Sequence, residues 1–144
     1  MATITRSRSA AHADGHRAGF VRAAIVGLTL VTAYVHASLG GLLFLANAAG
    51  YVALALGMVL PGPFATFRWL VRLALLGFTS ATIGAWFLFG ARFALAYADK
   101  GLEVVLVGIL AAELWQLDGG PGGVVVRGRE LFASVVRRAE RATR

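Results

Sequence analysis

The longest uncharged stretch of the chain is "AAIVGLTLVTAYVHASLGGLLFLANAAGYVALALGMVLPGPFATF", residues 23–67, which contains no Asp, Glu, Lys or Arg. One membrane-spanning helix needs about 20 apolar residues. The stretch therefore has room for two spans, separated near "SLGG" at 38–41. A soluble core would have to cover every face of both helices, and a chain of 144 residues is too short for that.

The composition of the whole chain agrees with a membrane protein. It is 58% hydrophobic and 15% charged, with a mean hydropathy of +0.74, whereas a soluble domain carries roughly a quarter charged residues. The fold that we predict is an all-α integral membrane protein, a four-helix transmembrane bundle followed by a C-terminal amphipathic helix. The predicted spans are 20–39, 42–60, 70–90 and 97–117, with breaks at "SLGG", "PGPFATF" and "FGARF".

The segments outside the spans are polar. Residues 1–19 contain scattered arginines and no periodic pattern of apolar residues, which predicts a flexible cytoplasmic tail. The "DGGPGG" stretch at 118–123 predicts a Gly/Pro linker. Residues 124–144 predict a basic amphipathic helix on the cytoplasmic face of the membrane.

Charge asymmetry sets the predicted orientation. With both termini in the cytoplasm, only Arg92 and Lys100 lie outside. The other twelve basic residues lie inside: Arg6, Arg8, Arg17, Arg22, Arg68, Arg72, Arg127, Arg129, Arg137, Arg138, Arg141 and Arg144. Because thirteen of the fourteen basic residues are Arg and Ala, Gly and Val are abundant, the sequence is typical of a GC-rich bacterium. We therefore expect a multi-pass protein of the bacterial inner membrane.

The chain resembles itself at an offset of 50 residues. "VRAAIVGLTLVTAYVHASLG" at 21–40 matches "VRLALLGFTSATIGAWFLFG" at 71–90 in seven of twenty positions, including one Arg and two Thr. This similarity predicts two tandem helical hairpins related by a parallel repeat.

Polar residues gather at one predicted depth, near the outer ends of the spans. The first span runs outward and the fourth inward, so residues late in one and early in the other share a level. Ionisable groups at membrane depth usually face the bundle interior. Here the ionisable groups serve either as a structural plug or as a functional site. We expect Leu106, further along the fourth span, to face lipid. The candidate cluster comprises His36, Asn47, Trp86, Asp99, Lys100 and Glu103.

The basic residues of the last segment predict a different contact. Their positions oppose an apolar arc, which favours binding to the anionic inner leaflet; docking onto a partner protein is the alternative. The residues concerned are Arg127, Arg129, Arg137, Arg138 and Arg141.

Several classes of function are excluded or disfavoured. With no Cys, the chain has no disulfide or thiolate metal site. The sequence pI of about 11.3 reflects basic residues at span ends rather than a basic face interleaved with aromatics, so we expect no nucleic acid partner. One His with two carboxylates resembles a facial triad, but no short motif supports it, and we predict neither a metal nor a cofactor.

Three functions remain open. The first is a non-catalytic accessory or assembly subunit of a larger membrane complex. The second is an oligomeric cation or proton carrier or channel that uses the polar cluster, and the third is a quinone- or lipid-binding redox component. The first requires no catalytic motif, and we expect the chain to act as a homo-oligomer or as a subunit rather than as an enzyme.

Overall fold

The computed structural model describes the backbone of residues 2–142 and the side chains of 15–141 other than 63, 64 and 118. Within these residues every regular element is a helix, so the all-α prediction is confirmed. The elements are α1 (Ala2–Leu39), α2 (Leu42–Val59), the short 3₁₀ helix η1 (Gly62–Phe67), α3 (Arg68–Phe89), α4 (Ala94–Asp118) and α5 (Gly120–Ala142).

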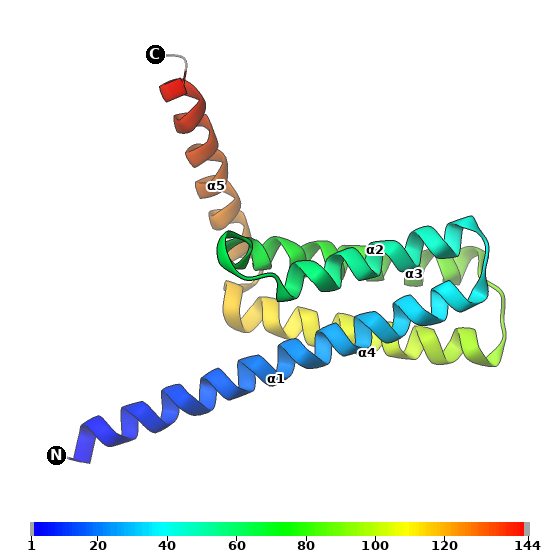
Figure 1. Ribbon diagram of the computed structural model, residues 1–144, viewed down its shortest axis with the longest axis horizontal. Coiled ribbons are helices and arrows are strands. Elements are labelled where there is room, and N and C mark those ends of the chain that lie inside the picture. Colours follow the sequence, from blue (N-terminus) through cyan, green and yellow to red (C-terminus); the bar gives the residue numbers. More distant parts are fainter. Residues whose placement is uncertain (1, 143–144) are drawn as a thin grey trace.

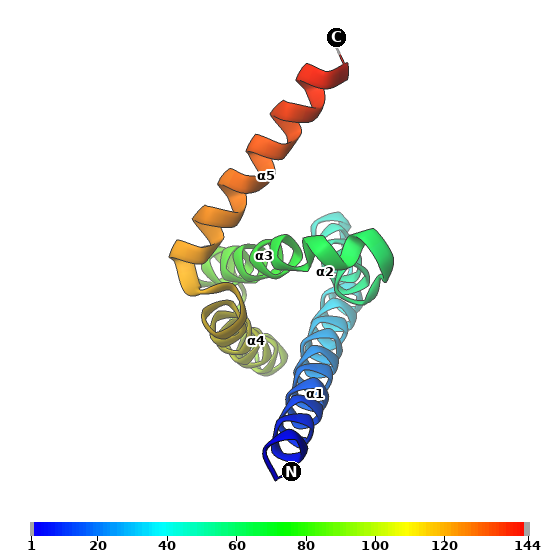
Figure 2. The ribbon, with the colours of Figure 1, turned by 90° about the vertical axis from the view of Figure 1, so that its left-hand side faces the viewer.

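Helices α1 to α4 lie side by side (Figure 1), and Figure 2 shows them arranged around a common interior. Helix α1 packs against α2 and α4, and α3 packs against the same two helices. The α1–α2 and α3–α4 turns lie together at one end, which we call the hairpin end. At the opposite end, the η1 end, α1 extends beyond its neighbours and α5 projects away from them.

Three helical segments are long and apolar enough to cross a membrane: Gly15–Leu39, Leu42–Val59 and Ala65–Phe89. Only 28%, 22% and 11% of their most apolar windows are buried inside the protein, respectively. Apolar surface left exposed on this scale indicates contact with lipid. Helix α4 does not meet the same composition criterion because it carries four charged side chains before its last residue: Asp99, Lys100, Glu103 and Glu113.

Glycine determines two local features of this arrangement. Gly40 and Gly41 have φ values of 70° and 84°, which residues with a Cβ adopt rarely, and they form the α1–α2 turn. On α2, a Cβ at Gly50 would lie 2.7 Å from Cζ of Phe78, so the absence of a side chain lets α2 and α3 approach closely. At Gly108 of α4, by contrast, a Cβ would have no neighbour within 4 Å.

The buried apolar core occupies the interior between the four helices. Its members are Ile25, Ala33, Tyr51, Met58, Leu75, Leu106 and Leu110. Leu106 is fully buried, so the expectation that it faces lipid is wrong. The reason is helical spacing, since Leu106 follows Glu103 by three residues and shares its inward face.

The segments outside the core differ from the predicted boundaries. Helix α1 begins at Ala2 and no proline interrupts it, so the backbone of residues 2–19 is helical, and the flexibility of this segment stays a prediction. The predicted linker at 118–123 shortens to a break at Gly119, whose φ of 72° ends α4 in a left-handed conformation. Helix α5 then begins at Gly120 rather than at 124, since Pro121 is compatible with a first helical turn. Residues 143 and 144 lie outside the described range.

Candidate functional site

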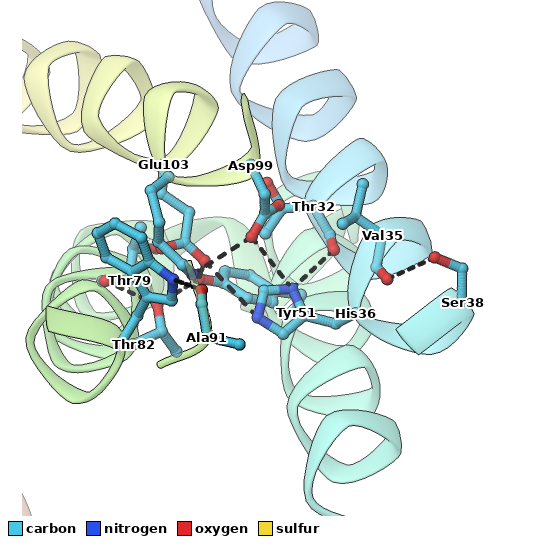
Figure 3. A network of polar contacts seen from close by, with 12 residues as sticks. Thr32, Val35, His36, Ser38, Tyr51, Thr79, Thr82, Ala91, Asp99 and Glu103 are labelled. Atoms are coloured by element: carbon cyan, nitrogen blue, oxygen red, sulfur yellow. Dashed lines mark hydrogen bonds and ion pairs between the residues drawn. The ribbon is translucent and has the colours of Figure 1, made fainter. Parts of the chain in front are cut away.

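Four ionisable side chains meet inside the core near the hairpin end, and we call them the ionic cluster: His36, Asp99, Lys100 and Glu103. His36 lies in the last turn of α1, and the others lie in the first ten residues of α4. Figure 3 shows His36 beside Asp99 and Glu103. Asp99 and Glu103 are four residues apart and share a face of α4, as does Lys100 three residues before Glu103. That face meets His36 because α1 and α4 pack together.

Lys100 pairs with both carboxylates. Its Nζ lies 2.7 Å from Oε2 of Glu103 and 3.2 Å from Oδ2 of Asp99. The shorter contact is an ion pair rather than a directed hydrogen bond, since Oε2 has no hydrogen-bond partner of suitable geometry. The His36 ring reaches the same two carboxylates, with Nδ1 3.7 Å from Oδ2 of Asp99 and Nε2 3.8 Å from Oε1 of Glu103.

The backbone of α1 fixes which nitrogen of His36 carries a proton. Nδ1 lies 2.9 Å from the carbonyl oxygen of Thr32, and a carbonyl oxygen can only accept. Nδ1 is therefore the donor in either charge state of the ring. Nε2, the other ring nitrogen, faces Glu103.

Tyr51 of α2 and Thr82 of α3 extend the network to all four helices. The Tyr51 hydroxyl donates to Oε1 of Glu103 at 3.0 Å and lies 2.9 Å from Oγ1 of Thr82. Thr82 Oγ1 also lies 2.8 Å from the carbonyl oxygen of Thr79. Each hydroxyl has one proton, so when Tyr51 donates to Glu103, Thr82 can donate either to Tyr51 or to Thr79. Tyr51 thereby orients the Glu103 carboxylate, and Thr82 contacts the Tyr51 hydroxyl.

The ionic cluster is buried, and its formal charges do not balance while His36 is neutral. The exposed fractions of His36, Asp99, Lys100 and Glu103 are 3%, 3%, 8% and 0%. Two carboxylates and one ammonium sum to −1 when His36 is neutral and to zero when it is protonated. Since a buried charge is costly unless it is paired, the cluster favours one additional positive charge, either a proton on His36 or another cation.

A cavity of about 550 Å³ adjoins the ionic cluster at the hairpin end. Its walls are mainly apolar and aromatic, and they come from the ends of all four helices. Five polar residues line it: His36, Asn47, Thr82, Asp99 and Lys100. The cavity therefore combines an apolar interior with an ionic surface on one side.

Asn47 and Trp86 line this cavity but do not join the ionic cluster. The Trp86 indole donates from Nε1 to the carbonyl oxygen of Ala91 at 3.1 Å. The guanidinium carbon of Arg92 lies 4.3 Å from the centre of a Trp86 ring, and Tyr97 contacts that side chain edge-on at 5.2 Å. Of the six predicted residues, the structure thus brings four together and places two at the adjoining cavity.

The residues of the ionic cluster include a set of metal-ligating types. One ligand atom each from His36, Asp99 and Glu103 lies within 4.8 Å of the others, and such a combination suits several divalent ions. Lys100, however, already places its ammonium against both carboxylates. A metal ion would have to displace that ammonium, so we assign no metal to these residues.

The predicted membrane-surface arginines lie on α5, which projects from the η1 end (Figure 1). Arg127 is half-buried, and one of its terminal nitrogens donates to the carbonyl oxygen of Leu117 at 3.3 Å. The other four, Arg129, Arg137, Arg138 and Arg141, are exposed. Phe132, on the same helix, is 72% exposed, so α5 presents both an apolar and a basic surface.

The residues described here define an all-helical protein with three helices apolar enough to cross a membrane and a buried ionic cluster at one end. Comparison with protein-family models, curated proteins and solved structures gives no match.

Proposed function

We propose that the chain is a small four-span protein of the bacterial inner membrane that acts as a non-catalytic accessory or assembly subunit of a larger membrane complex. The observation that carries the proposal is the internal pairing of the ionic cluster, which joins α1 to α4. Tyr51 of α2 donates to this cluster and is itself contacted by Thr82 of α3. In this role the cluster holds the two hairpins together within the apolar medium.

A fourth span at α4 is supported by its length and by the direction of its charges. Twenty-five residues make a helix of about 37 Å, compared with about 30 Å for the hydrocarbon core. Asp99, Lys100 and Glu103 are buried rather than directed to the surface. Glu113 carries an ion pair to Arg72 of α3 at 3.6 Å. Charges placed in this way can cross a bilayer without facing lipid.

The orientation rests on the basic residues of the η1 end. The positive-inside rule places α5 and the N-terminal extension of α1 in the cytoplasm and the hairpin end outside. Helix α5 would then lie on the anionic inner leaflet with Phe132 directed into it. Its position outside the packed core also leaves it accessible to a partner subunit.

The proposed duplication of the hairpins is supported by matching positions on α1 and α3. Thr29 and Thr32 of α1 are fully buried, as is Thr79 of α3, which the sequence offset pairs with Thr29. Thr82, paired with Thr32, is half-buried and bonds to Tyr51. Equivalent inward positions are expected if both hairpins descend from one unit.

A through-channel in one chain is disfavoured by the core beyond the cluster. Toward the η1 end, the interior contains the buried apolar side chains of Ile25, Leu75, Leu106 and Leu110. The next polar pair, Arg72 and Glu113, lies on the far side of these residues. Ten residues of α4 separate Glu103 from Glu113, or about 15 Å. A proton or cation would need a polar path across that distance.

Native membranes provide the test of the subunit proposal. A tagged chain extracted in mild detergent should migrate in native electrophoresis well above its 15.1 kDa mass plus a micelle, with reproducible partner proteins. Migration as a monomer without partners would contradict the proposal.

Proton or cation carriage is the second candidate, and the −1 charge of the ionic cluster favours it. The cluster gains neutrality when His36 takes one proton, which is the chemistry of a proton-loading site. Reconstitution of the purified chain into liposomes distinguishes a carrier from a non-catalytic subunit. Proton or cation flux that the Glu103→Gln variant abolishes, at unchanged stability, would replace the subunit proposal with a carrier.

A further inference from the structure

We propose that the cavity at the hairpin end binds a lipophilic primary ammonium, with the charged nitrogen on Asp99 and the apolar body among the aromatic walls. The inference is independent of the subunit proposal, because it rests on the cavity and on one carboxylate oxygen. A subunit, a carrier or an isolated protein could each contain this site.

The unpartnered oxygen of Asp99 identifies the kind of head group. Asp99 lines the cavity and is 3% exposed, and its Oδ1 is buried without a hydrogen-bond partner. Its Oδ2 is engaged by Lys100 at 3.2 Å and approached by His36 at 3.7 Å. A buried acceptor without a donor is unfavourable. A ligand that supplies an N–H or O–H at Oδ1 removes this cost.

Charge selects an ammonium over a neutral hydroxyl. With neutral His36, the ionic cluster sums to −1, since Asp99 and Glu103 are opposed by Lys100 alone. An ammonium at Oδ1 brings the sum to zero and replaces the proton that His36 would otherwise need. A hydroxyl donates to Oδ1 equally well but leaves the negative charge in place. In a desolvated cavity, the charged donor makes the stronger interaction.

The walls select a lipophilic body. Phe44, Phe78, Trp86, Phe89 and Phe93 contribute aromatic rings, and His36 tilts against Phe44 at a centroid distance of 6.1 Å. The volume of about 550 Å³ lies within the range of small-molecule sites, about 300–1,000 Å³. Aromatic faces also attract cations, which adds to the preference for a positive head group.

The experiment uses the full chain in phosphatidylcholine nanodiscs and two probes that differ only in the head group. Energy transfer from the protein's tryptophans, including Trp86 in the cavity wall, reports the binding of 1-pyrenemethylammonium or of 1-pyrenemethanol. Empty nanodiscs correct for partition into lipid. We expect saturable binding of the ammonium, with the alcohol at least about tenfold weaker because it leaves the charge unbalanced. Equal affinities for the two probes would overturn the proposal.

Three variants assign the binding to the cavity. Asp99→Asn should weaken binding of the ammonium by at least about tenfold, because the counter-charge is lost. Ala85→Leu adds bulk at an exposed residue of the cavity wall, leaves the ionic cluster intact and should also reduce binding. Ala111→Leu, which adds the same bulk at an exposed residue of α4 outside the cavity lining, should retain it. If Asp99→Asn does not fold, Ala85→Leu carries the test, and unchanged affinity in that variant would overturn the assignment.

The same ammonium has two sources, a free lipophilic amine or the head group of phosphatidylethanolamine. Replacing part of the phosphatidylcholine with phosphatidylethanolamine distinguishes them. Competition with the probe identifies a lipid head group, and unchanged probe affinity identifies a free amine. Both results support an ammonium site, whereas stronger probe binding in the presence of phosphatidylethanolamine would contradict it.

Discussion

Replacement of Lys100 by Met tests how far the buried carboxylates depend on one ammonium. Lys100 Nζ lies 2.7 Å from Glu103 and 3.2 Å from Asp99, and neither acid is more than 3% exposed. Removing one partner of a buried ion pair costs about 3–5 kcal/mol, because the remaining charge has lost its compensation. In Lys100→Met, two carboxylates would remain with His36 alone. We expect the free energy of unfolding to fall by an amount in this range.

A second substitution should recover part of the loss. Glu103→Gln removes one of the two stranded charges, and its amide oxygen can still accept from Tyr51. In the double variant, Asp99 is balanced when His36 is protonated. The double variant should therefore lose less than the sum of the two single losses, with an interaction energy of about 0.5–3 kcal/mol.

Unfolding in mixed lipid–detergent micelles measures the stability of the four proteins of this double-mutant cycle, namely the unaltered chain, the two single variants and the double variant. Arg92→Met is the matched control, because Arg92 is a cation at the same end of the molecule whose contact with Trp86 is at the surface. An exposed cation–π contact contributes about 0.5–1 kcal/mol. If Lys100→Met costs no more than Arg92→Met, or if the double variant is strictly additive, the ionic cluster does not act as a compensated unit.

Three further predictions follow from the fold. Gly50→Ala should lower the free energy of unfolding by about 1–3 kcal/mol, because its Cβ would lie 2.7 Å from Phe78. Gly108→Ala is the control and should be neutral or stabilising, because the added Cβ meets no neighbour. Equal effects of the two variants in thermal unfolding would contradict the close approach of α2 to α3. In intact cells, Ser38→Cys should react with an impermeant thiol reagent while Thr66→Cys reacts only after permeabilisation, and the reverse pattern would overturn the proposed orientation. Deletion of α5 should leave the remaining helices folded and reduce co-sedimentation with anionic vesicles, whereas failure to insert would make α5 part of the folding unit.

The helices and the ionic cluster could be predicted from sequence because both depend on spacing along one chain. The uncharged stretch at 23–67 required two long helices. The depth of His36, Asp99 and Glu103 followed from the direction of each span. Their convergence then needed only helical periodicity, which places Asp99 and Glu103 on one face.

The rest of the site depends on how the helices are rotated and packed against one another, which spacing does not specify. Tyr51 lies within an apolar segment and has the appearance of a core aromatic, yet its hydroxyl is the donor to Glu103. The one feature of the sequence that indicates a role for Tyr51 is its hydroxyl within a predicted span, because a polar group there needs a hydrogen-bond partner. The expectation for Leu106 is wrong for a different reason, because helical spacing alone places it three residues after Glu103 on the same inward face of α4.

Helices α1 and α5 are both longer than the composition of the terminal segments indicated. Polar residues before Gly15 favoured a tail, but a helix already nucleated by an apolar span can continue through them at little cost. At the other end, four glycines favoured a long linker. A single left-handed residue, Gly119, is sufficient to end α4, and α5 begins directly after it.

His36 and Glu103 meet as parts of one buried cluster. Solid-state NMR of the full chain in lipid bilayers, with labelled His and Glu, tests it directly. We expect a through-space contact between the His36 ring and the Glu103 carboxylate. We also expect Nδ1 of His36 to carry a proton, and the ring protons to exchange slowly with bulk water. A His36 ring that contacts only lipid or water, with Glu103 in free exchange with solvent, would contradict it.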